Sequence, residues 1–172
     1  MFQITDAMRA AWEDKAEPKA SDSEVTQIEQ TFGITLPKSY VEFIKTHGYV
    51  IFGLDADNRR AFTYRVTAGA QVESRQASIS FLHGAADILQ AHRILTSDAD
   101  PDDPSLPAFP ADYLPIGNDA GQGQILLEMR PQLGRIWFWP EREWRWGTQD
   151  NTQLGFVADD FESFINGLRP WT

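Results

Sequence analysis

The sequence predicts an α+β fold that combines helices near the N-terminus, a run of antiparallel strands and a closing helix. Helical periodicity occurs before residue 48 and after residue 160, and short β-rich segments follow one another between residues 114 and 139. Strands and helices do not alternate as they do in doubly wound parallel sheets. A length of 172 residues with 42% hydrophobic side chains suits one core, so we expect a single domain over residues 1–172.

Two helices are predicted in the first 48 residues. Ser21 and Glu24 form a capping-box pattern at the start of the first helix, which is expected over residues 22–32. The second is expected from Pro37 to Gly48, because proline suits the first turn of a helix and glycine its end. Their apolar faces are Val25, Ile28 and Phe32 in the first helix and Tyr40, Phe43 and Ile44 in the second.

The middle of the chain is expected to hold strands and one more helix. Tyr49–Phe52 and Ala61–Val66 are rich in β-forming residues and flank the turn-forming segment Asp55–Asn58, which predicts a hairpin. Ser78–Leu82 predicts a further strand, and apolar residues at helical spacing predict a helix over residues 84–95. An acidic, proline-containing loop follows this helix.

The last third is expected to form an antiparallel meander and an amphipathic helix. The strands of the meander are Leu114–Gly117, Ile125–Met129 and Arg135–Trp139. Two aspartates then precede a helical stripe, where their charge favours a helix N-terminus. The stripe consists of Phe161, Phe164, Ile165 and Leu168.

Negative charge is concentrated in the second half of the chain. The protein has 15 Lys and Arg against 25 Asp and Glu, and residues 87–172 hold 6 basic and 14 acidic side chains. Such a surface repels phosphate backbones, so we do not expect direct nucleic-acid binding, whereas a basic protein would be attracted. Solubility alone is the simpler explanation of the charge.

Composition and spacing argue against several other classes of protein. With no cysteine, the chain has no disulfide scaffold, thiol nucleophile or thiolate zinc site. No long apolar run or signal-peptide pattern occurs, so we expect a cytoplasmic protein that does not bind membranes. The three histidines are far apart, and the aspartates from residue 98 to 102 have calcium-loop spacing without the required glycine and glutamate. We therefore expect no metal, no cofactor and no catalytic residue.

An aromatic cluster and the acidic residues around it are the candidate binding residues. Trp137 and Trp139 alternate with Ile136 and Phe138, so they face the opposite side of a strand. We expect Phe138 and one of these two tryptophans in the core, whereas for Trp144 and Trp146 core packing and partner contact remain open. The candidate partner-binding residues are Asp98, Asp100, Asp102, Asp103, Asp119, Glu141, Glu143, Trp144, Trp146 and Asp150.

Residues 24–48, EVTQIEQTFGITLPKSYVEFIKTHG, resemble the opening signature of the SUKH superfamily of Smi/Knr-like domains. A later block, from residue 114 to 164, is also similar to the strand and helix pattern of that superfamily. The resemblance implies a twisted antiparallel sheet flanked by helices, without catalytic residues. Its bacterial members act as immunity proteins, and its fungal members are associated with cell-wall regulation. The residues that match the signature are Gly33, Leu36, Pro37, Tyr40, Phe43 and Gly48.

The resemblance and the charge together favour a non-catalytic immunity protein that neutralises a cognate toxin in bacterial competition. Nuclease toxins are basic, and an acidic inhibitor can occupy a phosphate-binding cleft with a high association rate. The alternative is a carbohydrate-binding or cell-wall-associated regulatory module in which Trp144 and Trp146 stack on sugar rings. A third hypothesis, a glycosidase using Glu141 and Glu143, competes with the simpler view that both are exposed carboxylates beside arginines.

Overall fold

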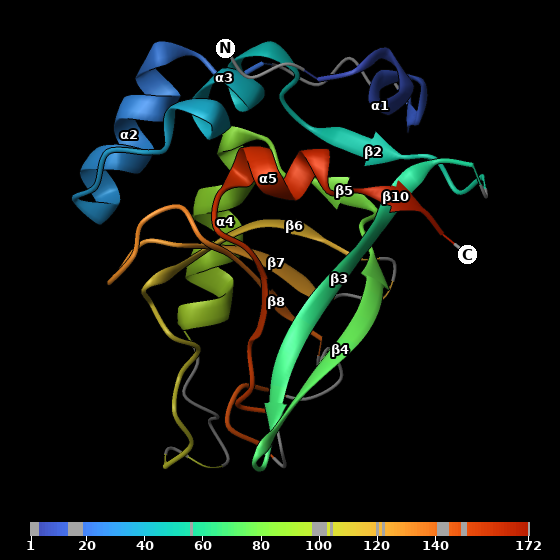
Figure 1. Cartoon of the computed structure of the whole chain (residues 1–172). Helices are drawn as coiled ribbons and strands as arrows, with labels where there is room; N and C mark the ends of the chain where they lie inside the picture. The colour runs from blue at the N-terminus through green and yellow to red at the C-terminus, as the bar shows by residue number, and fades with distance from the viewer. Residues whose placement is uncertain are drawn as a thin grey trace.

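The computed structural model has an α+β fold in which helices cover a curled antiparallel sheet (Figure 1). In the view of Figure 1 most helices lie toward the top, and the hairpin of β3 (Arg59–Ala68) and β4 (Gln71–Ser78) extends away from them. The structure describes residues 4–13, 19–55, 57–97, 103, 105–119, 121, 123–140, 145–148 and 151–171.

The helices of the described chain differ in length from one to three turns. They are α1 (Asp6–Ala10), α2 (Asp22–Phe32), α3 (Lys38–Thr46), α4 (Ala85–Thr96) and α5 (Phe161–Asn166). No helix within these ranges has the length and apolar character needed to cross a membrane. Asp160 caps the start of the closing helix α5, and its side chain accepts a hydrogen bond from the Ser163 backbone N–H, 2.7 Å away.

The predicted helices α2 and α3 are confirmed, although Pro37 caps the start of α3 and His47 its end, so that the helix is slightly shorter than predicted. Ser21 and Glu24 form the expected capping box, in which the Ser21 backbone N–H donates to the Glu24 carboxylate over 2.8 Å. Gly33 ends α2 with a φ of 63°, the left-handed conformation that glycine adopts without steric cost. These hydrogen bonds stabilise the negative form of Glu24 and lower its pKa.

The strands join into one sheet along most of the chain. They are β1 (Trp12–Glu13), β2 (Val50–Phe52), β3 (Arg59–Ala68), β4 (Gln71–Ser78), β5 (Phe81–Leu82), β6 (Tyr113–Asn118), β7 (Gln124–Glu128), β8 (Ile136–Trp139), β9 (Gly155–Ala158) and β10 (Arg169–Pro170). Their order in the sheet is β1-β2-β5-β6-β7-β8-β9-β3-β10, and β4 pairs with β3. The predicted meander is confirmed as β6, β7 and β8.

The predicted hairpin between Tyr49–Phe52 and Ala61–Val66 is wrong. The first of these segments, as β2, pairs with β1 and β5, whereas the second, as β3, pairs with β4, β9 and β10. The partner of β3 was missed because β4 is a polar strand, with Gln71 through Gln76 all exposed, and so lacks the alternation of apolar residues that marks a half-buried strand.

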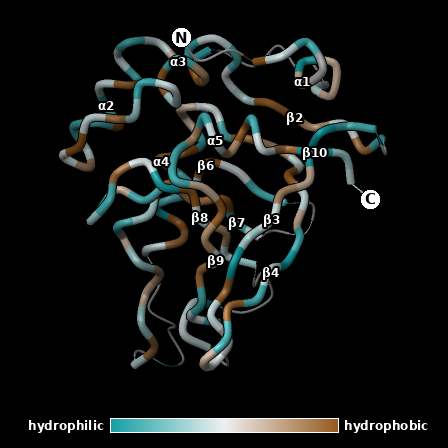
Figure 2. Tube along the Cα trace, viewed as in Figure 1, coloured by the Kyte–Doolittle hydropathy of each residue, from teal (hydrophilic) through white to brown (hydrophobic). Residues whose placement is uncertain are grey.

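Both faces of the central strands are covered, which explains their nearly continuous apolar sequences. Figure 2 shows apolar residues along β7, β8 and β9. One face, with Ile125, Leu127, Ile136 and Phe138, joins the large core under the helices. The other face, with Leu126 and Trp139, forms a smaller cluster with Phe109. Because strands buried on both faces are rich in apolar residues at every position, the simple alternation disappears here.

Candidate functional site

The smaller cluster on one face of β8 brings together Trp137, Trp139 and Trp146, three of the tryptophans that the sequence singled out. Phe138 and Trp139 are only 1% and 6% exposed, which confirms that Phe138 and one strand tryptophan belong to the core. Trp137 is half-buried, and its indole N–H donates to the carboxylate of the buried Glu128 over 2.8 Å. The strand therefore divides its aromatic side chains between two cores, as the alternation predicts.

A hydrogen-bonded loop fixes the position of Trp146 beside this cluster. The Trp139 indole N–H donates to the side-chain oxygen of Asn151, which is 2% exposed. The Asn151 side-chain NH₂ donates in turn to the Arg145 carbonyl over 2.8 Å. The ring of Trp146 then packs nearly perpendicular to Trp139 and Phe109, with centroid separations of 5.9 and 5.2 Å. A buried strand residue thus positions a half-buried tryptophan on a loop.

Trp146 borders a small hollow on the surface. The hollow has a volume of about 120 Å³. Small-molecule sites usually occupy about 300–1,000 Å³, so this one suits a single side chain of a protein partner better than a whole ligand. Ile94 at its rim is 57% exposed, so it adds apolar surface beside Trp146. The lining residues are Ile94, Leu95, Pro107, Phe109, Trp139, Arg145 and Trp146.

Only three of the ten candidate partner-binding residues lie within the described residues. Trp146 is half-buried at the hollow. Asp103 is exposed, and hydrogen bonds from the Ser105 hydroxyl and backbone N–H lower its pKa. Asp119 accepts the backbone N–H groups of Gly121 and Gly123, each over 2.7 Å, and so organises the turn before β7. Asp98, Asp100, Asp102, Glu141, Glu143, Trp144 and Asp150 lie outside the described residues.

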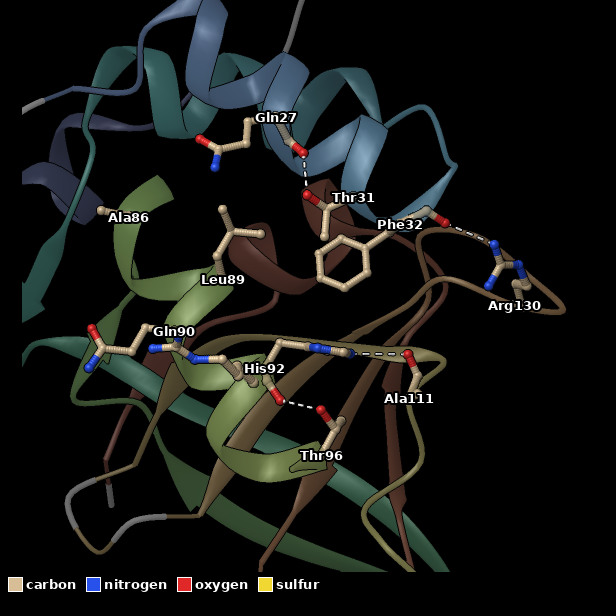
Figure 3. Close-up of a pocket in the computed structure, with 11 residues that line it drawn as sticks. Gln27, Thr31, Phe32, Ala86, Leu89, Gln90, His92, Thr96, Ala111 and Arg130 are labelled. Carbon is tan, nitrogen blue, oxygen red and sulfur yellow. Dashed lines mark hydrogen bonds between the residues drawn. The ribbon is translucent and has the colours of Figure 1, made fainter. Parts of the chain in front are cut away.

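A second, larger hollow runs between α2 and α4 (Figure 3). This groove has a volume of about 770 Å³, which is within the usual range of ligand sites. Phe32 and Leu89 supply its apolar surface, and the other side chains are mostly amides, hydroxyls and bases. The residues that line it are Gln27, Thr31, Phe32, Ala86, Leu89, Gln90, His92, Arg93, Thr96, Ala111 and Arg130.

Hydrogen bonds hold the walls of this groove together. His92 Nε2 lies 3.2 Å from the Ala111 carbonyl oxygen, which can only accept, so this nitrogen carries the hydrogen. The His92 ring meets the Phe32 ring edge-on, with centroids 4.6 Å apart. Arg130 donates to the Phe32 carbonyl over 2.8 Å and lies 3.6 Å from the Asp112 carboxylate. Figure 3 shows the His92 and Arg130 bonds at the edge of the groove.

Two arginines line the groove of this acidic protein, and one of them, Arg130, is paired with Asp112. Arg93 and Arg130 are both exposed, and no Asp or Glu is among the described side chains that line the groove. Sequence analysis missed it because its residues come from two helices that are about 60 positions apart in the sequence. Phe32 lies on the predicted apolar face of α2 and remains half-buried at the groove. Elsewhere in the described residues, no three His, Asp or Glu side chains are placed to hold a metal ion.

Comparison with known proteins agrees with the architecture. The model of the SMI1 / KNR4 family (SUKH-1) matches residues 19–167. No curated protein matches this sequence. The family match spans α2 to α5 and includes every strand of the central meander. The chain therefore belongs to the SMI1 / KNR4 (SUKH-1) family.

Proposed function

We propose that this protein is a non-catalytic immunity protein that binds a cognate protein toxin and neutralises it. The observation that carries the proposal is membership of the SMI1 / KNR4 (SUKH-1) family over residues 19–167. The excess of acidic side chains in residues 87–172 supports a basic partner, such as a nuclease domain, because opposite charges accelerate association.

The hollow at Trp146 is the best candidate for the centre of the contact surface. Interface hot spots are aromatic or aliphatic groups that become fully desolvated on binding and are surrounded by polar residues. Trp146 and the exposed Ile94 fit this description, and the Trp146 ring packs against the buried Trp139 and Phe109. Most of the other candidate partner-binding residues are close in sequence to residues that line the hollow. They are Asp98, Asp100, Asp102, Asp103, Glu141, Glu143, Trp144 and Asp150.

Coexpression with the toxic domain encoded beside this protein tests the proposed function. We expect coexpression to restore growth of the host cell and to give a complex that can be purified. Failure of rescue, with both proteins soluble, would contradict the pairing. Changing Asp100, Asp102 and Asp103 to Lys should also slow association and reduce its salt dependence.

A pair of matched variants tests the placement of the contact surface. Ile94→Arg adds a bulky cation at the rim of the hollow, and the 57% exposure of Ile94 means that folding should be little affected. Leu54→Arg is the control, because Leu54 is 71% exposed and is not among the lining residues. We expect Ile94→Arg to weaken toxin binding by about tenfold or more, and Leu54→Arg to leave it unchanged. Equal affinities would place the contact elsewhere.

A carbohydrate-binding module is the second candidate function, and the groove between α2 and α4 is the observation that favours it. Its volume of about 770 Å³ accommodates a small glycan, and its amide and hydroxyl side chains can hydrogen-bond to sugar hydroxyls. Calorimetric titration with cell-wall glycan fragments tests this function. Heat of binding that is lost on changing Gln90 to Ala would favour the module, whereas no heat with any fragment would remove it.

A further inference from the structure

Strand β4 forms one free edge of the sheet. It pairs with β3 through eight consecutive residue pairs, from Ala61 opposite Ser78 to Ala68 opposite Gln71, and this register contains no bulge. Within the described residues no other strand pairs with β4. The side chains from Gln71 to Gln76 are exposed, and the hairpin projects away from the helices (Figure 1). An unbroken edge of this length presents unpaired N–H and C=O groups that can accept a further strand.

The charges on this edge lie on one side of the strand. Glu73 and Arg75 are two positions apart and so point to the same face, where they form an ion pair of 2.8 Å. Their partners in β3 are Val66 and Tyr64, so both charges share the face that β3 turns toward the core. Charges on this face of an edge strand usually oppose pairing with a further strand. Here the two charges have opposite sign, and one pairing register turns them into attractions.

That register follows from the geometry of antiparallel pairing with a second copy. Residues directly opposite each other point to the same face, so Glu73 can face only residue 71, 73, 75 or 77. If Glu73 lies opposite Glu73 of the other copy, two glutamates repel each other. If it lies opposite residue 77, the two Arg75 side chains lie opposite each other and repel. If it lies opposite residue 71, only a few residues of the two strands overlap. With Glu73 opposite Arg75, Ser74 faces Ser74, and residues 71–77 all pair.

We propose that β4 pairs with β4 of a second copy of this chain, antiparallel, with Ser74 at the two-fold axis. The sheet then continues from one copy into the other. Glu73 of each copy lies opposite Arg75 of the other, and the two ion pairs are equivalent by symmetry. Opposite charges directly across two strands stabilise the pairing, and like charges destabilise it. A seven-residue strand pair is smaller than a standard interface, so the dimer forms reversibly with increasing protein concentration.

Charge reversal at the two positions tests both the dimer and its register. Sedimentation equilibrium of the full chain should show a monomer–dimer equilibrium. Glu73→Arg or Arg75→Glu alone turns both symmetric attractions into repulsions, and we expect dimerisation to weaken by about thirtyfold. An equimolar mixture of the two variants restores Arg opposite Glu at both positions. We therefore expect a heterodimer from two proteins that fail to dimerise separately.

Matched controls separate this effect from net charge and from misfolding. Glu42→Arg and Lys38→Glu change the net charge by the same amounts and break an exposed ion pair of 3.8 Å on α3, so both should dimerise like the wild type. Circular dichroism confirms that each variant is folded. The proposal is overturned if the wild type remains monomeric up to a protein concentration of about 1 mM. It is equally overturned if the single variants dimerise normally, or if folded single variants give no heterodimer when mixed.

Discussion

The hydrogen bond between Trp139 and Asn151 predicts a large loss of stability from a small change, because both side chains are buried. Asn151→Ala removes the acceptor of the Trp139 indole N–H, in a place where Trp139 and Asn151 are 6% and 2% exposed. Water cannot replace the lost partner without opening the cluster. A buried donor left unpaired costs about 1–3 kcal/mol.

The same substitution also removes the donor to the Arg145 carbonyl. Arg145 is exposed, so water can replace the lost hydrogen bond to its carbonyl. The net contribution of this hydrogen bond is about 0.5–1.5 kcal/mol. The free energy of unfolding should therefore fall by about 2–4 kcal/mol, which leaves a typical protein folded. Because residues 145–148 carry Trp146, binding of the proposed toxin partner should weaken although Asn151 itself is buried.

Urea unfolding of four proteins measures the expected coupling: the wild type, Asn151→Ala, Trp139→Phe and the double variant. Trp139→Phe keeps an aromatic ring in the cluster but has no N–H to donate. If the hydrogen bond carries the effect, the double variant should lose at least about 1 kcal/mol less than the sum of the single losses. Additive losses would refute the reasoning, and the stability of the loop would then depend on other contacts.

Two further predictions concern His83 and Gly155. Burial lowers the pKa of His83, and the nearby Asp87 only partly opposes this shift. The unfolded chain therefore binds a proton at His83 more readily than the folded chain, so stability should fall as pH drops below about 6.5. His83→Phe should reduce this dependence of the melting temperature on pH. An unchanged slope would mean that other groups cause it. Gly155→Ala would place a Cβ 2.3 Å from Cδ2 of the buried Tyr64, so the free energy of unfolding should fall by about 1–3 kcal/mol in urea denaturation. An unchanged denaturation midpoint would mean that Tyr64 moves away without cost.

The helices could be predicted from the sequence because their signals are local. The capping box at Ser21 and Glu24 satisfies backbone N–H groups at the start of α2, and Gly33 supplies the left-handed residue at its end. The stripe of Phe161, Phe164 and Ile165 is buried as its spacing predicts. Each of these features depends on residues within a few positions of one another, so no knowledge of distant partners is needed.

Strand pairing could not be predicted in the same way, because it depends on distant residues. Phe52 and Ala61 flank a turn-forming segment, yet β2 pairs with β5 at Leu82 and Phe81 instead of β3. The polar strand β4 has no alternation of apolar residues, because its side chains from Gln71 to Gln76 are exposed. The groove between α2 and α4 has the same origin, because helix packing alone brings Phe32 to His92.

The division of β8 between two cores has a consequence for how the protein could bind a partner. Phe138 contacts Tyr64 and Phe62 in the large core, whereas the adjacent Trp139 contacts Phe109 and Trp146 on the other face. The hollow at Trp146 is therefore supported by a strand whose other face packs into the large core. A hot spot built on such a rigid support loses little conformational entropy on binding, so more of its contact energy remains as affinity. Substitutions that loosen this support should consequently speed dissociation more than they slow association, whereas changes in the acidic loops should do the opposite.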